Sequence, residues 1–129
     1  MKTSRADIAP YVTKDGSLIR ELMHPDVHPP EKGGGRLSLA EARVEPGAVT
    51  MEHVHDRSEE IYHFTSGQGS MSLAGREFPV GPGDTVRIAP GQAHKVRNHG
   101  DAILVFLCCC APPYAHDDTR PAGPEEAEP

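Results

Sequence analysis

Tryptophan is absent from this 129-residue chain, and there are only three phenylalanines and three tyrosines. A core must therefore be built mainly from Val, Leu, Ile, Ala and Met side chains. Cysteine is also scarce: the chain has three, and they are consecutive, at Cys108, Cys109 and Cys110. Adjacent cysteines cannot form an intrachain disulfide framework around a core, so we expect a protein of the reducing cytoplasm.

Long apolar runs are missing as well. The N-terminus, MKTSRADIAP, contains none, so we expect no signal peptide. The longest run, from residue 102 to 111, ends at two prolines. It is too short to cross a bilayer and predicts a buried strand instead.

An excess of positive charge is the third absence. The net charge is −6, which argues against nucleic acid or an anionic membrane as a main partner. We expect a small-molecule substrate, no nucleic acid and no membrane.

What the chain does contain is a series of short apolar or alternating segments, separated by turns rich in its 13 glycines and 13 prolines. The segments that we predict to be strands are 17–23, 37–45, 69–73, 76–80, 85–88, 95–98 and 102–110. Without helical periodicity, this pattern predicts one all-β domain, a sandwich or a barrel. We divide the chain into an N-terminal strand-and-loop arm (1–36), a barrel (37–118) and a disordered tail (119–129).

The stretch from Gly47 to Gly67 holds three side chains that can bind a metal: His53, His55 and Glu60. Two histidines two positions apart project from the same face of a strand, whereas on a helix they would lie about 200° apart. The stretch therefore predicts a strand through residues 49–55, with a returning strand that brings Glu60 opposite the histidines.

A fourth ligand is available at His94, where the resemblance to a known family becomes specific. The first stretch fits the pattern G-x5-H-x-H-x4-E-x6-G, and the second resembles G-x5-P-x-G-x2-H-x3-N, which are the two motifs of the cupins. The matching positions are Gly47, His53, His55, Glu60, Gly67, Gly83, Gly91, His94 and Asn98. One position departs from the motif, because Ala89 stands where the second motif has proline and Pro90 follows it.

This resemblance implies a cupin jelly-roll β-barrel with a metal inside it, held by His53, His55, Glu60 and His94. Three imidazoles and one carboxylate leave about two positions open on an octahedral divalent ion. Fe(II) and Mn(II) are favoured, and Ni(II), Co(II) and Zn(II) stay open, although zinc prefers four ligands. Cupins commonly pair, so we expect a homodimer, in which the strand at 17–23 reaches a neighbour.

Other candidates are weaker. Tyr62 shares the face of Glu60 and could act in the cavity as a catalytic residue, or simply pack in the core. His116 could close over the barrel mouth, or lie along the surface. The three cysteines are expected to be small hydrophobic residues, although one could lie near the metal. His24 and His63 are expected to be surface residues.

Three functions follow from the predicted site. The first is a metal-dependent dioxygenase that combines a chelating small molecule with dioxygen. The second is a redox-neutral isomerase, cyclase or lyase, in which the metal acts as a Lewis acid. The third is a non-catalytic protein that binds a small molecule. The motifs do not choose among them, since one fold carries many chemistries.

Overall fold

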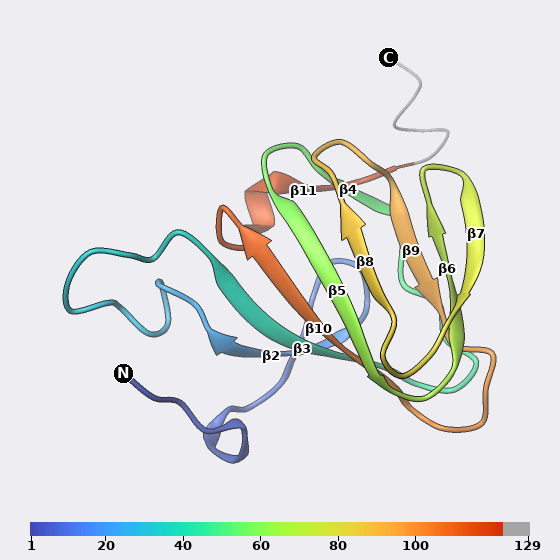
Figure 1. Ribbon diagram of the computed structural model, residues 1–129, viewed down its shortest axis with the longest axis horizontal. Helices are drawn as coiled ribbons and strands as arrows, with labels where there is room; N and C mark the ends of the chain where they lie inside the picture. Colours follow the sequence, from blue (N-terminus) through green and yellow to red (C-terminus); the bar gives the residue numbers. More distant parts are fainter. Residues whose placement is uncertain (123–129) are drawn as a thin grey trace.

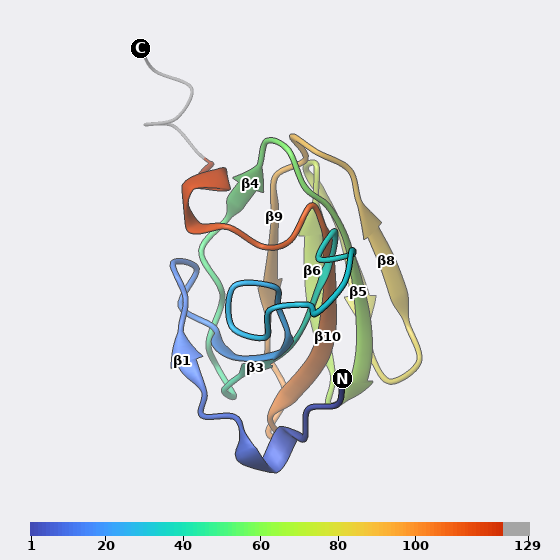
Figure 2. The ribbon, with the colours of Figure 1, turned by 90° about the vertical axis from the view of Figure 1, so that its left-hand side faces the viewer.

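The strands form two antiparallel sheets that enclose the core between them (Figures 1 and 2). The computed structural model describes residues 1–122. Its strands are β1 (Tyr11–Val12), β2 (Leu18–Met23), β3 (Ser38–Val44), β4 (His53–His55), β5 (Glu59–Ser66), β6 (Gly69–Leu73), β7 (Arg76–Val80), β8 (Thr85–Ile88), β9 (His94–Arg97), β10 (Leu104–Ala111) and β11 (Thr119–Pro121). Two single turns of 3-10 helix, η1 (Arg5–Asp7) and η2 (His116–Asp118), complete the described elements. The all-β prediction is confirmed.

One sheet has six strands in the order β1-β2-β3-β10-β5-β8, and the other has five in the order β11-β4-β9-β6-β7. Neighbours in each sheet are therefore often distant in the sequence, as in a jelly roll. The long loop between β2 and β3 projects from one end of the molecule (Figure 1). No helix within residues 1–122 is long and apolar enough to span a membrane.

The core depends on alternation in two neighbouring strands of the larger sheet. In β5 and β10 every second side chain is buried, which places Tyr62, Phe64 and Phe106 inside. The ring of Phe106 lies 4.8 Å from that of Tyr62 and 4.9 Å from that of Phe64. Phe64 is fully buried, so its truncation to alanine should cost about 3–5 kcal/mol.

Two motif residues have structural roles. Gly67 has φ +87°, and a Cβ there would lie 2.5 Å from the carbonyl oxygen of Ile103, so only glycine fits. Asn98 is fully buried, and its amide nitrogen donates to the carbonyls of Val44 and Ala102. Gly67 therefore allows a close backbone approach, and Asn98 ties the end of β3 to the segment before β10.

The departure from the second motif also has a structural explanation. The backbone N–H of Ala89 donates a 2.8 Å hydrogen bond to the side-chain oxygen of Gln92. Proline has no N–H group and could not make this bond. The turn before His94 is thus held by a side chain in place of a proline ring, and the departure leaves the fold unchanged.

Three expectations need correction. The predicted strand at 49–55 is regular only over His53–His55, and Val49 makes a single isolated bridge. Residues 119–121, predicted to be disordered, form strand β11 beside β4. The rest of that predicted tail, residues 123–129, lies outside the described residues. His24, predicted at the surface, is 6 % exposed, and its Nε2 lies 2.8 Å from the carbonyl oxygen of Tyr114.

The segment expected to reach a neighbouring subunit, β2, pairs with β3 of its own chain and contributes Ile19 to the core. The homodimer stays a prediction.

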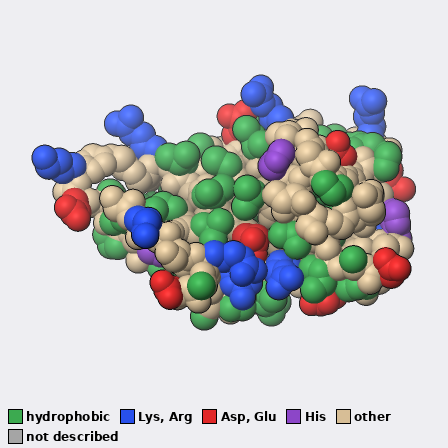
Figure 3. Space-filling model, turned by 60° about the horizontal axis from the view of Figure 1, so that its bottom comes forward, with side chains coloured by type: hydrophobic (Ala, Val, Ile, Leu, Met, Phe, Trp, Pro, Cys, Tyr) green, Lys and Arg blue, Asp and Glu red, His purple; other side chains and the backbone are tan. Residues whose placement is uncertain are grey.

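On the face seen in Figure 3, acidic and basic side chains are interspersed among hydrophobic ones, and no large field of one sign is visible there.

Candidate metal centre

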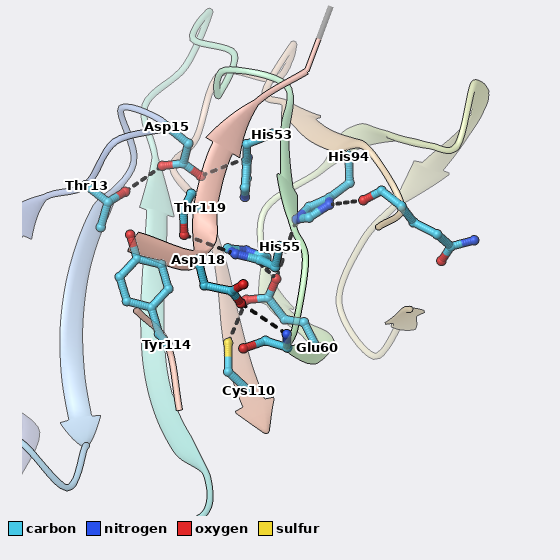
Figure 4. Close-up of polar contacts among 12 residues, drawn as sticks. Thr13, Asp15, His53, His55, Glu60, His94, Cys110, Tyr114, Asp118 and Thr119 are labelled. Atoms are coloured by element: carbon cyan, nitrogen blue, oxygen red, sulfur yellow. Dashed lines mark hydrogen bonds and ion pairs between the residues drawn. The ribbon is translucent and has the colours of Figure 1, made fainter. Parts of the chain in front are cut away.

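Three histidines and one glutamate meet between the two sheets. His53 and His55 lie on β4, His94 lies on β9 directly opposite His53, and Glu60 lies at the start of β5. One nitrogen from each imidazole lies within 4.8 Å of the others. Glu60 Oε1 lies 3.3 Å from His55 Nε2 and 3.5 Å from His94 Nε2 (Figure 4). The structure thus brings together all four predicted ligands.

Two of the imidazoles are oriented by backbone carbonyls. His53 Nδ1 lies 2.9 Å from the carbonyl oxygen of Met51, and His94 Nδ1 lies 2.9 Å from that of Gln92. A carbonyl only accepts hydrogen bonds, so each Nδ1 carries the proton and each Nε2 keeps a free lone pair. Such partners fix the tautomer that a metal-binding histidine needs.

His55 is oriented by a side chain instead. Its Nδ1 lies 3.1 Å from the hydroxyl oxygen of Thr119 on β11. Because that hydroxyl donates its own proton to the carbonyl oxygen of Ala115, 2.9 Å away, it accepts from His55. All three histidines therefore have a partner for Nδ1.

The facing atoms have no such partner. His55 Nε2, His94 Nε2 and Glu60 Oε1 are buried and make no hydrogen bond within the described part of the chain. Leaving buried polar atoms unpaired costs about 1–3 kcal/mol each. A divalent cation among them would satisfy all three at once, so the residues present fit the predicted metal.

The electrostatics favour the forms that bind metal. Burial, together with the neighbouring His94, lowers the pKa of His53 to about 4, which keeps the imidazole neutral. Burial alone would raise the pKa of Glu60, but the adjacent imidazoles of His55 and His94 lower it well below the usual range. The site thus offers a neutral His53 imidazole and a carboxylate at neutral pH. Burial lowers the pKa of His55 but the Glu60 carboxylate raises it by more, so a metal would displace a proton there.

Cys110 orients the carboxylate. Its thiol lies opposite Glu60 in the pairing of β10 with β5 and donates to Glu60 Oε2 over 3.1 Å. Burial raises the pKa of this thiol, so it keeps its proton. With Oε2 occupied, Oε1 is the oxygen left for a metal. One cysteine therefore does lie beside the predicted ligands, which the sequence had left open.

A cavity of about 40 Å³ adjoins the ligands, with room for a few water molecules. Its lining comes from both ends of the chain as well as from the motifs. The lining residues are Tyr11, Thr13, Asp15, Ser17, Ile19, Glu21, Ser38, Ala40, Ala42, His53, His55, Glu60, Tyr62, Phe106, Cys108, Cys110 and Tyr114.

Of the two predicted catalytic residues, one lines the cavity and the other lies outside it. Tyr62 lines the cavity, is 4 % exposed, and has its ring 5.8 Å from that of His94. His116 is exposed on η2 and does not line the cavity. Its Nδ1 lies 2.9 Å from the hydroxyl of Tyr114, and Tyr114 does line the cavity. His63, predicted to face away from the metal, bonds to Thr85 on the outer side of the sheet.

Sequence reasoning missed several residues of the site. Thr119 comes from the segment after the last long strand, and Asp15, Tyr11 and Glu21 come from the N-terminal arm. The Lys14-Asp15-Gly16 turn signal was visible, but nothing in it pointed to a metal site. The alternation of the last strand was the one usable signal, since it placed Cys108 and Cys110 on a single face.

The comparisons with known proteins agree with the geometry. The family model for the cupin domain matches residues 40–110. The chain is 48 % identical to the uncharacterized protein MJ1618 of Methanocaldococcus jannaschii over 120 residues, 93 % of each chain. It is 31 % identical to an oxalate-binding protein of Thermotoga maritima over 70 % of this chain and 67 % of that one. It is 32 % identical to a glucose-6-phosphate isomerase of Thermococcus kodakarensis, over 67 % of this chain but only 53 % of the isomerase.

Solved structures show the same fold. A predicted oxalate decarboxylase from Thermotoga maritima superposes with a TM-score of 0.74 at 22 % identity, over 86 % of this chain and 98 % of that one. The Streptomyces nucleoside dehydratase Pac13 gives a TM-score of 0.73 in its complex with uridine, at 19 % identity, over 95 % and 90 % of the two chains. With its two-sheet jelly roll and both histidine motifs in place, this chain belongs to the cupin family.

Proposed function

We propose that this cupin is a metal-dependent enzyme acting on a small organic molecule, with the metal held by His53, His55, Glu60 and His94. One observation carries the proposal: buried, unpartnered atoms of His55, Glu60 and His94 face one another, and two of these residues, His55 and Glu60, line a cavity. When bound, the metal would supply Lewis acidity at an oxygen of the substrate. Fe(II) and Mn(II) suit three imidazoles and one carboxylate better than Zn(II), which tends to close a four-ligand site.

For the reaction class, we place a redox-neutral isomerase or lyase first, because the cavity offers a proton donor with a route to solvent. The phenol of Tyr114 lines the cavity, and burial raises its pKa to about 12, so it carries its proton at neutral pH. His116 Nδ1, 2.9 Å from that hydroxyl, belongs to an exposed side chain. In this proposal Tyr114 gives a proton to the substrate, and His116 returns one from water.

The relatives support this choice without deciding it. The 32 % identical proteins are named as isomerases, and isomerisation needs no external electron acceptor. A dioxygenase, which the ligand set alone favoured, is the second candidate. The observation in its favour is that the four predicted ligands leave room for two more donors on an octahedral ion.

Metal substitution separates the two classes. We would strip the protein and load it with Fe(II), Mn(II) or Zn(II). Turnover of hydroxy acids, sugar phosphates and nucleosides is then measured with and without air. Anaerobic turnover by the Mn(II) or Zn(II) form supports the redox-neutral enzyme. Turnover by the Fe(II) form in air alone supports the dioxygenase, and ligand binding without turnover by any form supports a binding protein.

Two matched variants test the residues. Tyr114→Phe and Tyr62→Phe each remove one hydroxyl from the same cavity wall. We expect Tyr114→Phe to lower kcat by about 100-fold, as loss of a general acid does, and metal content to stay unchanged. An equal loss in His116→Ala, rescued by imidazole, supports the relay. If Tyr62→Phe lowers kcat and Tyr114→Phe does not, the proton donor is Tyr62.

A further inference from the structure

The cavity has a second polar centre, supplied by the N-terminal arm. Glu21 lies on β2 opposite Ala40 of β3, and both side chains line the cavity. Strands β3 and β10 separate β2 from β5, which carries the predicted ligand Glu60. The carboxylate of Glu21 therefore belongs to a part of the wall distinct from the metal ligands.

One oxygen of this carboxylate is occupied and the other is not. The Tyr11 hydroxyl donates to Glu21 Oε2 over 2.7 Å. Burial, reinforced by Glu21 itself, raises the pKa of Tyr11, so the phenol keeps the proton that it donates. Glu21 Oε1 is buried and has no hydrogen-bond partner in residues 1–122, and the residue is only 8 % exposed. A buried carboxylate oxygen without a donor is costly unless a ligand supplies one.

The charges in the cavity point to the kind of ligand. Its lining includes three acidic residues, Asp15, Glu21 and Glu60, and no lysine or arginine among the described lining residues. With a divalent metal bound and all three carboxyl groups ionised, the net charge of the lining would be −1. A dianion would therefore enter an already negative cavity, whereas a hydroxyl or ammonium group would meet an acceptor.

We propose that Glu21 is a specificity-determining residue, whose Oε1 accepts a hydrogen bond from a hydroxyl or ammonium group of the substrate. This inference rests on the proposed function, in which the metal binds the other end of the same molecule. The substrate class is then a small molecule with metal-chelating oxygens at one end and an O–H or N–H donor a few ångströms away. Dicarboxylates are the class that Glu21 rejects.

A matched series of ligands tests this assignment in the metal-loaded protein. 2,4-Dihydroxybutanoate, 4-amino-2-hydroxybutanoate, 2-hydroxybutanoate and malate share one chelating head and end in hydroxyl, ammonium, methyl and carboxylate. Calorimetric titration of the Mn(II) form should give Kd values at least about tenfold lower for the first two than for 2-hydroxybutanoate, with malate weakest. Malate binding as tightly as the hydroxyl or ammonium ligand, or no binding by any of the four, overturns the proposal.

The variant Glu21→Gln keeps the shape of the side chain and removes its charge. It should erase the preference for the ammonium ligand and strengthen malate binding by about tenfold. Metal content, measured by elemental analysis, should remain that of the native protein. The ranking in the native protein needs no variant, so the proposal can be refuted even if Glu21→Gln does not fold. If the native protein binds no metal, the proposed function fails as well; if it binds metal and all four ligands alike, only the role of Glu21 fails.

Discussion

The substitution Thr119→Val tests whether the segment after the last long strand belongs to the metal centre. Thr119 is 6 % exposed, and its hydroxyl accepts the Nδ1 proton of His55 and donates to Ala115. Valine has the same shape and neither bond. His55 would then lose the group that fixes its tautomer and ring orientation, while every predicted ligand remains in place.

The size of the effect follows from that single contact. Removing a hydrogen-bond partner of a metal-binding histidine usually weakens metal binding 10- to 100-fold. That factor corresponds to about 1.4–2.8 kcal/mol. The metal-free protein should also lose stability, because the His55 N–H remains buried without a partner, although the carbonyl of Ala115 keeps the N–H of Asp118. The affinity is therefore measured by competition with a chelator, at a temperature where thermal melting shows the variant to be folded.

Thr85→Val is the matched control. Thr85 makes the same kind of contact, 2.8 Å from Nδ1 of His63, on the outer side of the sheet away from the cavity. We expect this variant to bind metal as the native protein does. Native-like metal affinity in Thr119→Val, or equal losses in both variants, would refute the role given to Thr119.

Three further predictions use other parts of the chain. His94→Ala should lose most bound metal by elemental analysis, whereas His63→Ala should keep it; the opposite result would mean that the strand register is wrong. Burial raises the pKa of Asp118, but hydrogen bonds from the backbone N–H groups of Arg57 and Ser58 outweigh burial and hold this pKa below its usual value. The stability it contributes is thus present above about pH 4 and lost at lower pH, so the difference in Tm between Asp118→Asn and the native protein should shrink from pH 7 to pH 3. Iodoacetamide should label the half-buried Cys109 before Cys110, whose pKa burial raises, and mass spectrometry of the native protein would reveal the reverse order.

Three of the four metal ligands could be predicted because their placement depends on short-range geometry. The two-residue spacing of His53 and His55 specifies one face of a strand wherever that strand lies. Glu60 follows after a short turn that leads from β4 in one sheet to β5 in the other, so its side chain meets the histidines between the sheets. Only His94 is remote in sequence, and the match to the second motif, rather than periodicity, identified it.

The extent of the strand before His53 could not be predicted, because its backbone partners come from different segments. The N–H of Thr50 donates to the carbonyl of Val96, whereas the N–H of Met51 donates to that of Asp15 in the N-terminal arm. A regular ladder needs successive bonds to one neighbouring strand. Local alternation cannot reveal that the partner changes between two adjacent residues.

Tail residues 119–121 were misjudged for a similar reason. Composition predicted disorder, since this segment has few apolar side chains. Its order comes instead from pairing with β4, and from the hydroxyl of Thr119 against His55, 64 positions earlier in the chain. Single contacts at such separation leave no periodic trace in a sequence.

The cavity residues that the sequence did not reveal lie outside the part of the chain that the family model covers, and this bears on substrate specificity. The family model covers residues 40–110 and so includes all four predicted ligands, but it stops short of Glu21 on one side and Tyr114 on the other. Both of these residues line the cavity. Relatives can therefore keep the metal site while the arm and the C-terminal segment change the groups that meet a substrate. For this reason likeness to an oxalate-binding protein and to isomerases is compatible with a different substrate here, and replacements within 11–21 and at Tyr114 should alter ligand choice more than metal content.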